Sequence, residues 1–443
     1  MKAVIYTKYR EEKRMYGYEF LTRDNNGILE IEGCNALDLL NEYGSPLYVM
    51  NERDIINRCR QIRENHIEKH NGFAVYASKA FSNKAMCRLV ASQGLGLDVV
   101  SGGEMFTANS VGFPMENIVF HGNNKAPYEI EMAVDLGVGR IIIDNFYDVE
   151  NVIKYASEKE KVTGVMVRVA PGVEGDTHEF IKTGHEDSKF GFSLNDGSLE
   201  KAIEKLLNCK YINFRGIHAH VGSQLLDNDV FRKEVVVLAK LYRKLTDMFN
   251  IEIKEINLGG GFGIYYTEND RRLDATYFTD LMNNEVDNQF KALSLTRPMV
   301  IIEPGRWVVG EAGVTLYTVG AIKNIEGVRK YISVDGGMTD NPRPPLYGAK
   351  YLAVAVENAD RDLEKVTVAG KCCESGDILI KDFEMPERKP TEHIAVLSTG
   401  AYNYSMSSNY NKLPKPAVVM VSEGTSRLIV KKETYEDIVR NDI

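Results

Sequence analysis

Two segments of the sequence carry residues that together could hold an aldehyde cofactor. Lys79 ends the run FAVYASK at residues 73–79, an apolar stretch of strand length that stops at small residues and a lysine. Residues 256–263, INLGGGFG, are typical of a strand that runs into a glycine loop. A lysine amine can form a Schiff base with an aldehyde, and a glycine loop at a strand end can hold a phosphate. The pair predicts a pyridoxal phosphate site, although a surface lysine and a tight turn remain alternatives for each segment alone.

A third segment, Glu303-Pro304-Gly305-Arg306, follows the apolar run 299–302 and places a carboxylate at another expected strand end. A carboxylate that faces a pyridine nitrogen keeps the ring protonated, and a protonated ring withdraws electrons from a carbanion at the substrate's α-carbon. An arginine in that place would disfavour ring protonation, so Glu303 favours decarboxylation over racemisation. A solvated salt bridge between Glu303 and Arg306 is the alternative.

A fourth segment, HAHVGS at residues 218–223, follows the run 214–217. Period-two alternation points His218 and His220 to the same side, where one of them could stack on a flat ring. Ser223 could form a hydrogen bond with a phosphate. Two metal ligands, or two ordinary histidines at a barrel end, are the alternatives. Because no clear carboxylate or third histidine accompanies the pair, we expect no metal site.

Short apolar runs alternate with amphipathic stretches through the segment that must position these residues. The runs lie at residues 47–49, 72–77, 97–100, 118–120, 140–143, 164–169, 214–219, 255–258 and 299–302. About eight strand–helix repeats predict an α/β fold built on a (β/α)8 barrel of the TIM type. A doubly wound sheet is the rival, but it would gather the chemistry at one switch point, whereas these candidates follow many strands.

The rest of the chain has a different residue pattern. The runs 314–319, 331–334, 365–368 and 417–421 are short, β-rich and separated by Gly and Pro, which predicts a mostly antiparallel β domain. We therefore expect three segments: an N-terminal extension at residues 1–45 whose strands join the β domain, a cofactor-binding barrel at 46–310, and a C-terminal β domain at 311–443.

Composition narrows the classes of function. The 443 residues carry a net charge of −9 and no basic stripe, so nucleic acid is not an expected partner. No run approaches the roughly 20 apolar residues that span a bilayer, and the N-terminus lacks the apolar core of a secretory signal. The six cysteines show no CxxC spacing, which favours a reduced cytoplasmic protein without zinc. Their only unusual feature is the adjacent pair Cys372-Cys373.

A series of longer motifs resembles a known family. In order along the chain they are YASKA, LDVVSGGE, HGNNK, THEFIKTG, SKFG, HAHVGSQ, LGGGFG, EPGR, VDGGMTDNPRPPLYGA, CCESGD and LSTGAYNYSMSSNYN. They resemble diaminopimelate decarboxylases, fold-type III pyridoxal-phosphate enzymes with an alanine racemase-like fold, from about residue 43 to 437. EPGR, CESGD and GAY recur across the wider decarboxylase family, whereas THEFIKTG and SMSSNYN are typical of the diaminopimelate branch.

The resemblance implies a role for each matching residue. Lys79 would carry the cofactor covalently, His220 would stack on its ring, and Glu303 would pair with the ring nitrogen. The inner wall of the cofactor site would be lined by Ala77 and Asp98. The phosphate would be held by Ser223, Gly260, Gly261, Gly305 and Arg306, with help from Tyr402. The substrate would be bound by Arg306, Arg343, Tyr347, Glu374 and Tyr402.

The reaction that the resemblance implies is decarboxylation of meso-2,6-diaminopimelate to L-lysine and CO2, the last step of lysine biosynthesis. Arginines would bind carboxylates, Glu374 the distal ammonium, and Cys373 would protonate the carbanion. The CESGD segment would reach into a neighbouring subunit, which implies a homodimer with shared active sites. Residues 177–191 are expected to form a mobile loop over the site.

Two other functions remain open at this point. One is a related decarboxylase acting on ornithine, arginine, carboxynorspermidine or a carrier-bound glutamyl group. Arg343 and Glu374 argue for a substrate with both charges at its distal end, and so against a plain diamine precursor. The other is a catalytically silent regulatory homologue, against which the retention of Lys79, Glu303 and Cys373 argues.

Overall fold

The computed structural model describes residues 15–173 and 188–443, which divide into two compact units. The barrel unit comprises Ile56–Ile264 and Arg272–Val308. The sheet unit comprises Met1–Ile55, Tyr265–Arg271 and Val309–Ile443. Both units are therefore built from segments that are distant in sequence.

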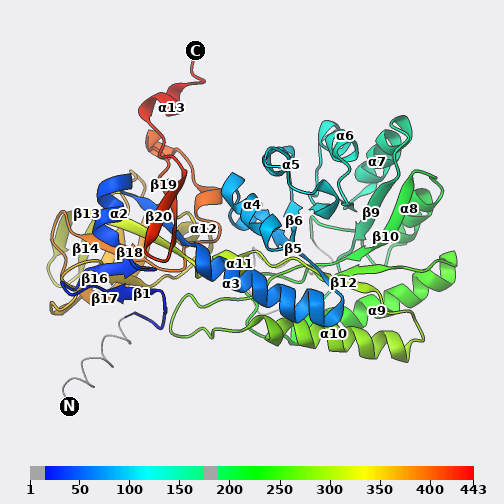
Figure 1. Cartoon of the computed structure of the whole chain (residues 1–443), viewed down its shortest axis with the longest axis horizontal. Coiled ribbons are helices and arrows are strands. Elements are labelled where there is room, and N and C mark those ends of the chain that lie inside the picture. Colours follow the sequence, from blue (N-terminus) through cyan, green and yellow to red (C-terminus); the bar gives the residue numbers. More distant parts are fainter. Residues whose placement is uncertain (1–14, 174–187) are drawn as a thin grey trace. The chain divides into compact units, whose positions relative to one another are not determined.

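The barrel unit contains a closed barrel of parallel strands (Figure 1). Its strands are β5 (Phe73–Ala77), β6 (Gly96–Val99), β7 (Ile118–Phe120), β8 (Arg140–Ile143), β9 (Thr163–Arg168), β10 (Ile212–His218), β11 (Glu255–Asn257) and β12 (Met299–Ile302). The barrel closes where β12 pairs with β5, through Ile301 with Phe73 and Ile302 with Ala74. The expected (β/α)8 barrel is thus confirmed.

Helices alternate with these strands along the chain. They are α3 (Glu52–Ile62), α4 (Lys84–Ser92), α5 (Gly102–Asn109), α6 (Pro127–Leu136), α7 (Phe146–Glu158), α8 (Ser198–Leu207), α9 (Asp229–Phe249), α10 (Ala275–Ala292) and α11 (Arg306–Val309). Short polar residues start several of them. The Asn83 side chain accepts a hydrogen bond from Met86 N at 3.0 Å and so caps α4, and Asn145 caps α7 in the same way through Asp148 N at 3.1 Å. Such caps turn the chain into a helix directly after a strand-end loop.

The middle of the barrel is apolar. Val75, Val119, Ile142, Met166 and Ile301 form a buried cluster contributed by the strands β5, β7, β8, β9 and β12. Layers of branched side chains are the usual filling of such a barrel, which is a packed core rather than a pore. We therefore expect polar, reactive side chains at the ends of the barrel strands.

The sheet unit holds a three-stranded sheet and a nine-stranded sheet. The small sheet is formed by β1 (Leu21–Arg23), β2 (Leu29–Ile31) and β3 (Cys34–Asn35), followed by α2 (Ala36–Tyr43). The large sheet runs in the order β17 (Ile378–Pro386), β16 (Leu363–Ala369), β14 (Arg329–Val334), β13 (Gly313–Ile325), β4 (Leu47–Asn51), β19 (Ala417–Ser422) and β20 (Thr425–Val430). Two further strands, β15 (Ala353–Ala355) and β18 (His393–Val396), pair with each other, and β18 also pairs with β13.

Most strand pairs of the sheet unit are antiparallel, as expected, but β4 with β19 and β14 with β16 are parallel. One core joins the N-terminal strands to the large sheet, since Leu29 and Ile31 pack in the same buried cluster as Leu47 and Val314. The short helices α12 (Arg343–Tyr347) and α13 (Tyr435–Val439) complete the unit.

One expected barrel strand lies elsewhere. Residues 47–49 belong to β4, which pairs antiparallel with β13 and parallel with β19 in the sheet unit rather than with any barrel strand. Every residue of β4 is buried, so its sequence is a continuous apolar run like that of a parallel barrel strand. It is also followed by the helix α3, which completes the resemblance to a β/α repeat.

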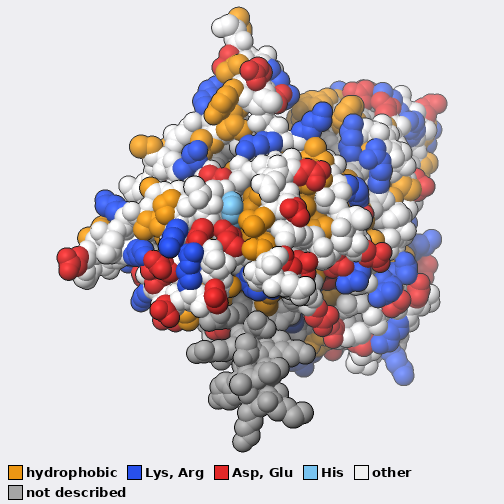
Figure 2. Space-filling model, turned by 60° about the vertical axis from the view of Figure 1, so that its left-hand side comes forward, with side chains coloured by type: hydrophobic (Ala, Val, Ile, Leu, Met, Phe, Trp, Pro, Cys, Tyr) orange, Lys and Arg blue, Asp and Glu red, His pale blue; other side chains and the backbone are white. Residues whose placement is uncertain are grey.

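The surface drawn in Figure 2 carries Lys, Arg, Asp and Glu side chains that are interspersed with scattered hydrophobic ones. Among the residues that the structure describes, no helix combines the length and the apolar character needed to cross a membrane.

Candidate active site

Polar side chains gather at the carboxyl ends of the barrel strands. They are Lys79 in the turn Ser78–Ala80 after β5, Asp98 in β6, His121 after β7, Arg168 at the end of β9, His218 at the end of β10, Asn257 at the end of β11 and Glu303 after β12. Residues from strands more than 200 positions apart in the sequence therefore meet at one end of the barrel. That end is the one at which (β/α)8 enzymes build their active sites.

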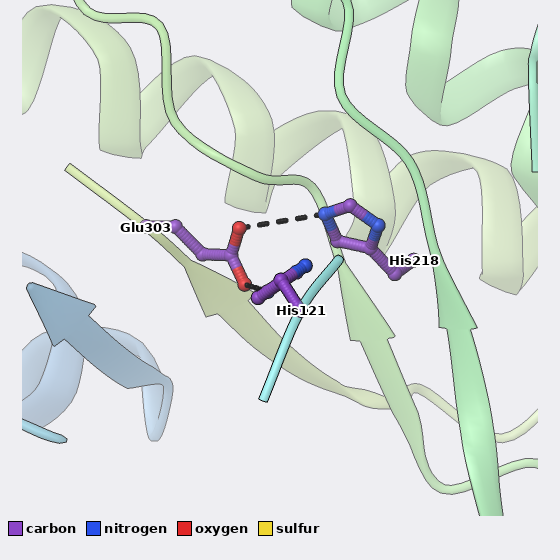
Figure 3. A group of neighbouring side chains, drawn as sticks. All are labelled: His121, His218 and Glu303. Carbon is purple, nitrogen blue, oxygen red and sulfur yellow. Dashed lines mark hydrogen bonds and ion pairs between the residues drawn. The ribbon is translucent and has the colours of Figure 1, made fainter. Parts of the chain in front are cut away.

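Glu303 lies at the centre of this group (Figure 3). His121 Nε2 lies 2.7 Å from its Oε1, and Asn257 Nδ2 donates a hydrogen bond to the same oxygen at 2.7 Å. His218 Nε2 lies 3.4 Å from the other oxygen, Oε2. Burial on its own would raise the pKa of Glu303, but His121 and His218 outweigh it and hold that pKa well below the usual range. Glu303 is therefore a buried carboxylate anion.

Two further charged residues lie close to this carboxylate. Asp98 Oδ1 lies 3.8 Å from His121 Nε2, and burial raises the pKa of Asp98 despite the opposing effect of His121. Arg168 packs its guanidinium 4.2 Å above the ring of Phe190 and lies 3.9 Å from Asp144. The cluster thus combines carboxylates, imidazoles and one guanidinium in a space from which water is largely excluded.

The EPGR loop packs against the end of β5, next to Lys79. Ala77 N donates a hydrogen bond to Pro304 O at 3.4 Å, and a Cβ added to Gly305 would lie 2.9 Å from the Cβ of Ala77. Lys79 itself is exposed beside this contact. After burial, its positive charge is the main reason why the pKa of His220 is well below the usual range. The structure therefore places Lys79, Ala77, Gly305 and His220 around one region of the barrel end.

The glycine loop after β11 is pressed between its neighbours. Gly260 N donates a hydrogen bond to His220 Nδ1 at 3.3 Å, and a Cβ on Gly260 would lie 2.1 Å from Glu303 O. Gly261 has a φ of +98°, and its Cβ would lie 2.3 Å from Gly222 O. Only glycine fits these positions, because any side chain would strike backbone atoms.

One hydrogen bond links two residues expected at the phosphate. Arg306 Nη2 donates to Ser223 Oγ at 3.0 Å. This bond joins the EPGR loop to the loop after β10.

In the sheet unit, Arg343 is a buried cation held by phenols. Its Nη1 donates to Tyr266 Oη at 2.9 Å and to Tyr351 Oη at 2.8 Å, and the ring of Tyr402 lies 6.0 Å from its Cζ. Within residues 15–173 and 188–443, no carboxylate forms an ion pair with Arg343, which is 7% exposed. A buried charge without a counter-charge costs free energy, so this guanidinium is suited to receive an anion.

The other expected substrate residues of the sheet unit lie on α12 and on loops. Tyr347 ends α12 and is half-buried, and Tyr402 adopts a φ of +66°, a left-handed conformation that is rare for a bulky residue. Cys373 and Glu374 are exposed in the loop between β16 and β17. In the part of the chain that the structure describes, no hydrogen bond or ion pair joins either of them to Arg343.

Two contacts shape the loop that carries Cys373. Cys373 N donates to Asn411 Oδ1 at 2.8 Å, within the SMSSNYN segment. Asp377 accepts hydrogen bonds from Met338 N at 2.7 Å and Cys372 N at 2.8 Å, and so ties this loop to the segment that leads to Arg343. Two motifs that are distant in sequence are thereby held to the same loop.

Sequence reasoning missed several residues of these clusters. No role was assigned to His121, although it directly follows the run 118–120 just as Glu303 follows 299–302, so the same strand-end argument would have found it. The expectation that no carboxylate or further histidine accompanies His218 is wrong, since candidate ligand atoms of His121, His218 and Glu303 lie within 4.8 Å of one another. Tyr266 and Tyr351 carry no local signal. Most of the expected loop 177–191, up to residue 187, lies outside the described residues.

The cluster around Glu303 fits the ring of pyridoxal phosphate. Oε1 of Glu303 takes two hydrogen bonds. Among the described residues, Oε2 is approached by His218 at 3.4 Å, and the ring nitrogens of His218 have no hydrogen-bond partner in suitable geometry. Asp98 Oδ1 is buried and likewise accepts no hydrogen bond from the described residues. Buried polar atoms usually find partners. A protonated pyridine nitrogen is a donor that would satisfy a carboxylate oxygen here.

Comparison with known proteins agrees with this geometry. A family model described as "Pyridoxal-dependent decarboxylase, pyridoxal binding domain" matches residues 52–310. The diaminopimelate decarboxylase of Bacillus subtilis (strain 168) is 47% identical over 426 residues, covering 95% of this chain and 96% of that protein. That of Bacillus methanolicus is 46% identical over 425 residues, covering 95% and 98%. The structure of M. jannaschii diaminopimelate decarboxylase in complex with L-lysine has a TM-score of 0.90 at 33% identity and covers 96% of this chain and 98% of that chain. The chain therefore belongs to the diaminopimelate decarboxylase family of pyridoxal-dependent decarboxylases.

Proposed function

We propose that this chain removes one carboxylate from meso-2,6-diaminopimelate with the help of pyridoxal phosphate, giving L-lysine and CO2 as the last step of lysine biosynthesis. The observation that carries the choice of substrate is Arg343, a buried guanidinium with phenol partners and no carboxylate partner among the described residues. A distal amino-acid group supplies that carboxylate. Ornithine, arginine and lysine lack it at their distal ends.

When bound, pyridoxal phosphate supplies an electron sink for the negative charge left at the α-carbon as CO2 departs. Glu303 accepts a hydrogen bond from the protonated ring nitrogen, a role suited to a carboxylate whose pKa is held low. Lys79 Nζ supplies the amine that anchors the cofactor aldehyde between turnovers, and His220 packs against the ring. Ala77 and Asp98 line the inner wall.

The cofactor phosphate would be held by the loops that the hydrogen bond between Arg306 and Ser223 joins. Backbone groups at close-packed glycines can approach an anion more closely than those of other residues. The proposed phosphate ligands are Ser223, Gly260, Gly261, Gly305 and Arg306, with Tyr402 assisting.

The substrate is bound at both of its amino-acid ends. Arg343 binds the distal carboxylate, and Glu374 binds the distal ammonium. Arg306, Tyr347 and Tyr402 complete the substrate site. Cys373 Sγ delivers the proton that replaces the lost carboxylate at the α-carbon.

Release of CO2 from meso-diaminopimelate tests this proposal, with ornithine, arginine and lysine as competing substrates. We expect turnover of diaminopimelate alone, and none in Lys79→Ala, which lacks the anchoring amine. Preference for ornithine, arginine or lysine would overturn the substrate assignment. Absence of turnover with all four, in protein saturated with pyridoxal phosphate, would favour a catalytically silent homologue.

We further propose that the protein works in the cytoplasm as a homodimer in which the loop carrying Cys373 and Glu374 completes the partner's site. The exposure of that loop supports the shared site, and the free state of the described cysteines supports the cytoplasmic location. Mixing Lys79→Ala with Cys373→Ala, each inactive alone, tests it. If sites are shared, random re-association should restore about a quarter of the wild-type activity, because half of the dimers are mixed and one of their two sites is intact. If each chain forms its own site, no activity returns.

A further inference from the structure

The two oxygens of Glu303 have unequal surroundings. Oε1 is engaged by His121 Nε2 and Asn257 Nδ2, each at 2.7 Å. Within the described part of the chain, Oε2 is approached by His218 Nε2 at 3.4 Å, without hydrogen-bond geometry. Figure 3 shows the two imidazoles on different oxygens of the carboxylate. A carboxylate turns readily about its last torsion, so hydrogen bonds to one of its oxygens fix the plane of the group and the direction in which the other oxygen points.

His121 is firmly placed to make that selection. Its backbone N–H donates to Val99 O at 2.8 Å, which ties it to the end of β6. Its ring meets that of His218 edge-on, with centroids 4.7 Å apart. The loop that follows is fixed by Lys125, whose buried Nζ donates to Gly122 O at 2.6 Å. The His121 side chain is 6% exposed and has little room to move.

The nearby groups also show what His121 does at Oε1. Asn257 can present only N–H groups to Oε1 from its Nδ2, so this oxygen already accepts a donor. Glu303 is held as an anion and has no proton to donate, so at a separation of 2.7 Å the proton must lie on His121 Nε2. His121 Nε2 therefore acts as a second hydrogen-bond donor at Oε1.

We propose that His121 is a positioning residue for Glu303: together with Asn257 it occupies Oε1, and so leaves Oε2 as the oxygen that pairs with the cofactor's ring nitrogen. This inference rests on the proposed use of pyridoxal phosphate. In this proposal His121 acts through Glu303, and its effect must therefore depend on the presence of a nitrogen in the ring.

That dependence gives a direct test in the full-length chain freed of cofactor. His121→Phe keeps a ring but removes the donor, whereas His121→Gln keeps a donor. Affinity is measured for pyridoxal phosphate and for its 1-deaza analogue, in which a carbon replaces the ring nitrogen. The single tryptophan, Trp307, is next to Arg306, so quenching of its fluorescence reports binding.

In His121→Phe we expect the Kd for pyridoxal phosphate to rise roughly ten- to a hundred-fold, with a change below about threefold for the deaza analogue. His121→Gln should recover most of the affinity for pyridoxal phosphate. His66→Gln is the matched control, since His66 is a buried histidine of the same unit that contacts Val300 O and Asn283 instead. It should change the affinity for both compounds by the same factor.

Equal losses for the two compounds in His121→Phe would overturn the inference, because a merely structural role affects both. Unchanged affinity for both would overturn it as well. If His121→Phe does not fold, His121→Ala takes its place in the same comparison. A wild type that prefers pyridoxal phosphate over the analogue, and loses that preference in the variant, supports the inference even if it releases no CO2 from diaminopimelate. The absence of CO2 release would refute the proposed substrate and leave the role of His121 standing.

Discussion

Glu234 gives a prediction whose size follows from the structure. This residue of α9 is fully buried, and neither of its carboxyl oxygens has a hydrogen-bond partner among the described residues. Burial, and then the negative charge of Glu303, raise the pKa of Glu234 well above its usual value of 4.5. A carboxyl group in this position is therefore protonated in the folded protein at pH values where it is ionised in the unfolded chain.

The sign of the pH dependence follows from this difference. Below about pH 4.5 both states hold the proton, and the group contributes its full stability. As the pH rises from there to the raised folded-state pKa, the unfolded chain loses the proton first, so the free energy of unfolding falls by up to about 1.4 kcal/mol per pH unit. Glu234→Gln has no such proton to lose. Its stability relative to wild type should therefore increase steadily with pH across this window.

Urea unfolding of the cofactor-free protein at several pH values between 5 and 8 measures this difference. Glu252→Gln, which removes one exposed glutamate, controls for the change in net charge. Other titrating groups are the same in both proteins and cancel in the comparison. If the stability difference between Glu234→Gln and wild type does not vary with pH, Glu234 is not a neutral buried acid and the reasoning fails.

Three other predictions concern the substrate residue Arg343, the buried acid Asp340 and the cofactor loop residue Gly260. Arg343→Gln should lower kcat/KM for diaminopimelate roughly ten- to a hundred-fold, through loss of a charge-assisted pair, while the affinity for pyridoxal phosphate stays the same; loss of cofactor affinity instead would contradict the assignment. Burial raises the pKa of Asp340 to about 7, so this residue lowers the stability of the wild type as the pH rises from about 4 to 7. Asp340→Asn should remove that contribution, as measured by urea unfolding. Gly260→Ala should abolish tight binding of pyridoxal phosphate in a fluorescence titration, because its Cβ would lie 2.1 Å from a backbone oxygen, whereas Gly103→Ala, with its nearest atom at 3.7 Å, should leave binding intact.

The barrel could be predicted because its signal is local and repeated. Each of its strands is an apolar run of a few residues, and the chemical groups follow where the run stops, as Lys79 and Glu303 do. The strand β4 shows the limit of that rule, since its buried residues match a barrel strand although it pairs with β13 and β19. Pairing partners are set by tertiary packing, which a single apolar run does not encode.

Groups that hold the reactive residues were harder to find. His121 could have been found from its position after β7, whereas Asn257 is a polar residue inside a run that otherwise reads as a plain strand. Tyr266 and Tyr351 meet at Arg343 from positions 85 residues apart, and a tyrosine in a loop gives no sign of which cation it will contact. Roles that depend on one residue and its strand are visible in the sequence, and roles that depend on a distant partner are not.

The charges at the end of the barrel explain why a protonated ring belongs there. Glu303 is held as an anion, Asp98 is a second carboxyl close to His121, and Arg168 Nε lies 3.9 Å from Asp144 Oδ1. The donors that face Glu303 are imidazoles and an amide, so no lysine or arginine among the described residues forms an ion pair with it. A pyridinium nitrogen at Oε2 would bring a positive charge to a carboxylate that has no lysine or arginine partner among the described residues. Because His121 and Asn257 already orient that carboxylate, little reorganisation is needed when the ring binds, which is the condition under which a buried charge contributes most to binding and catalysis.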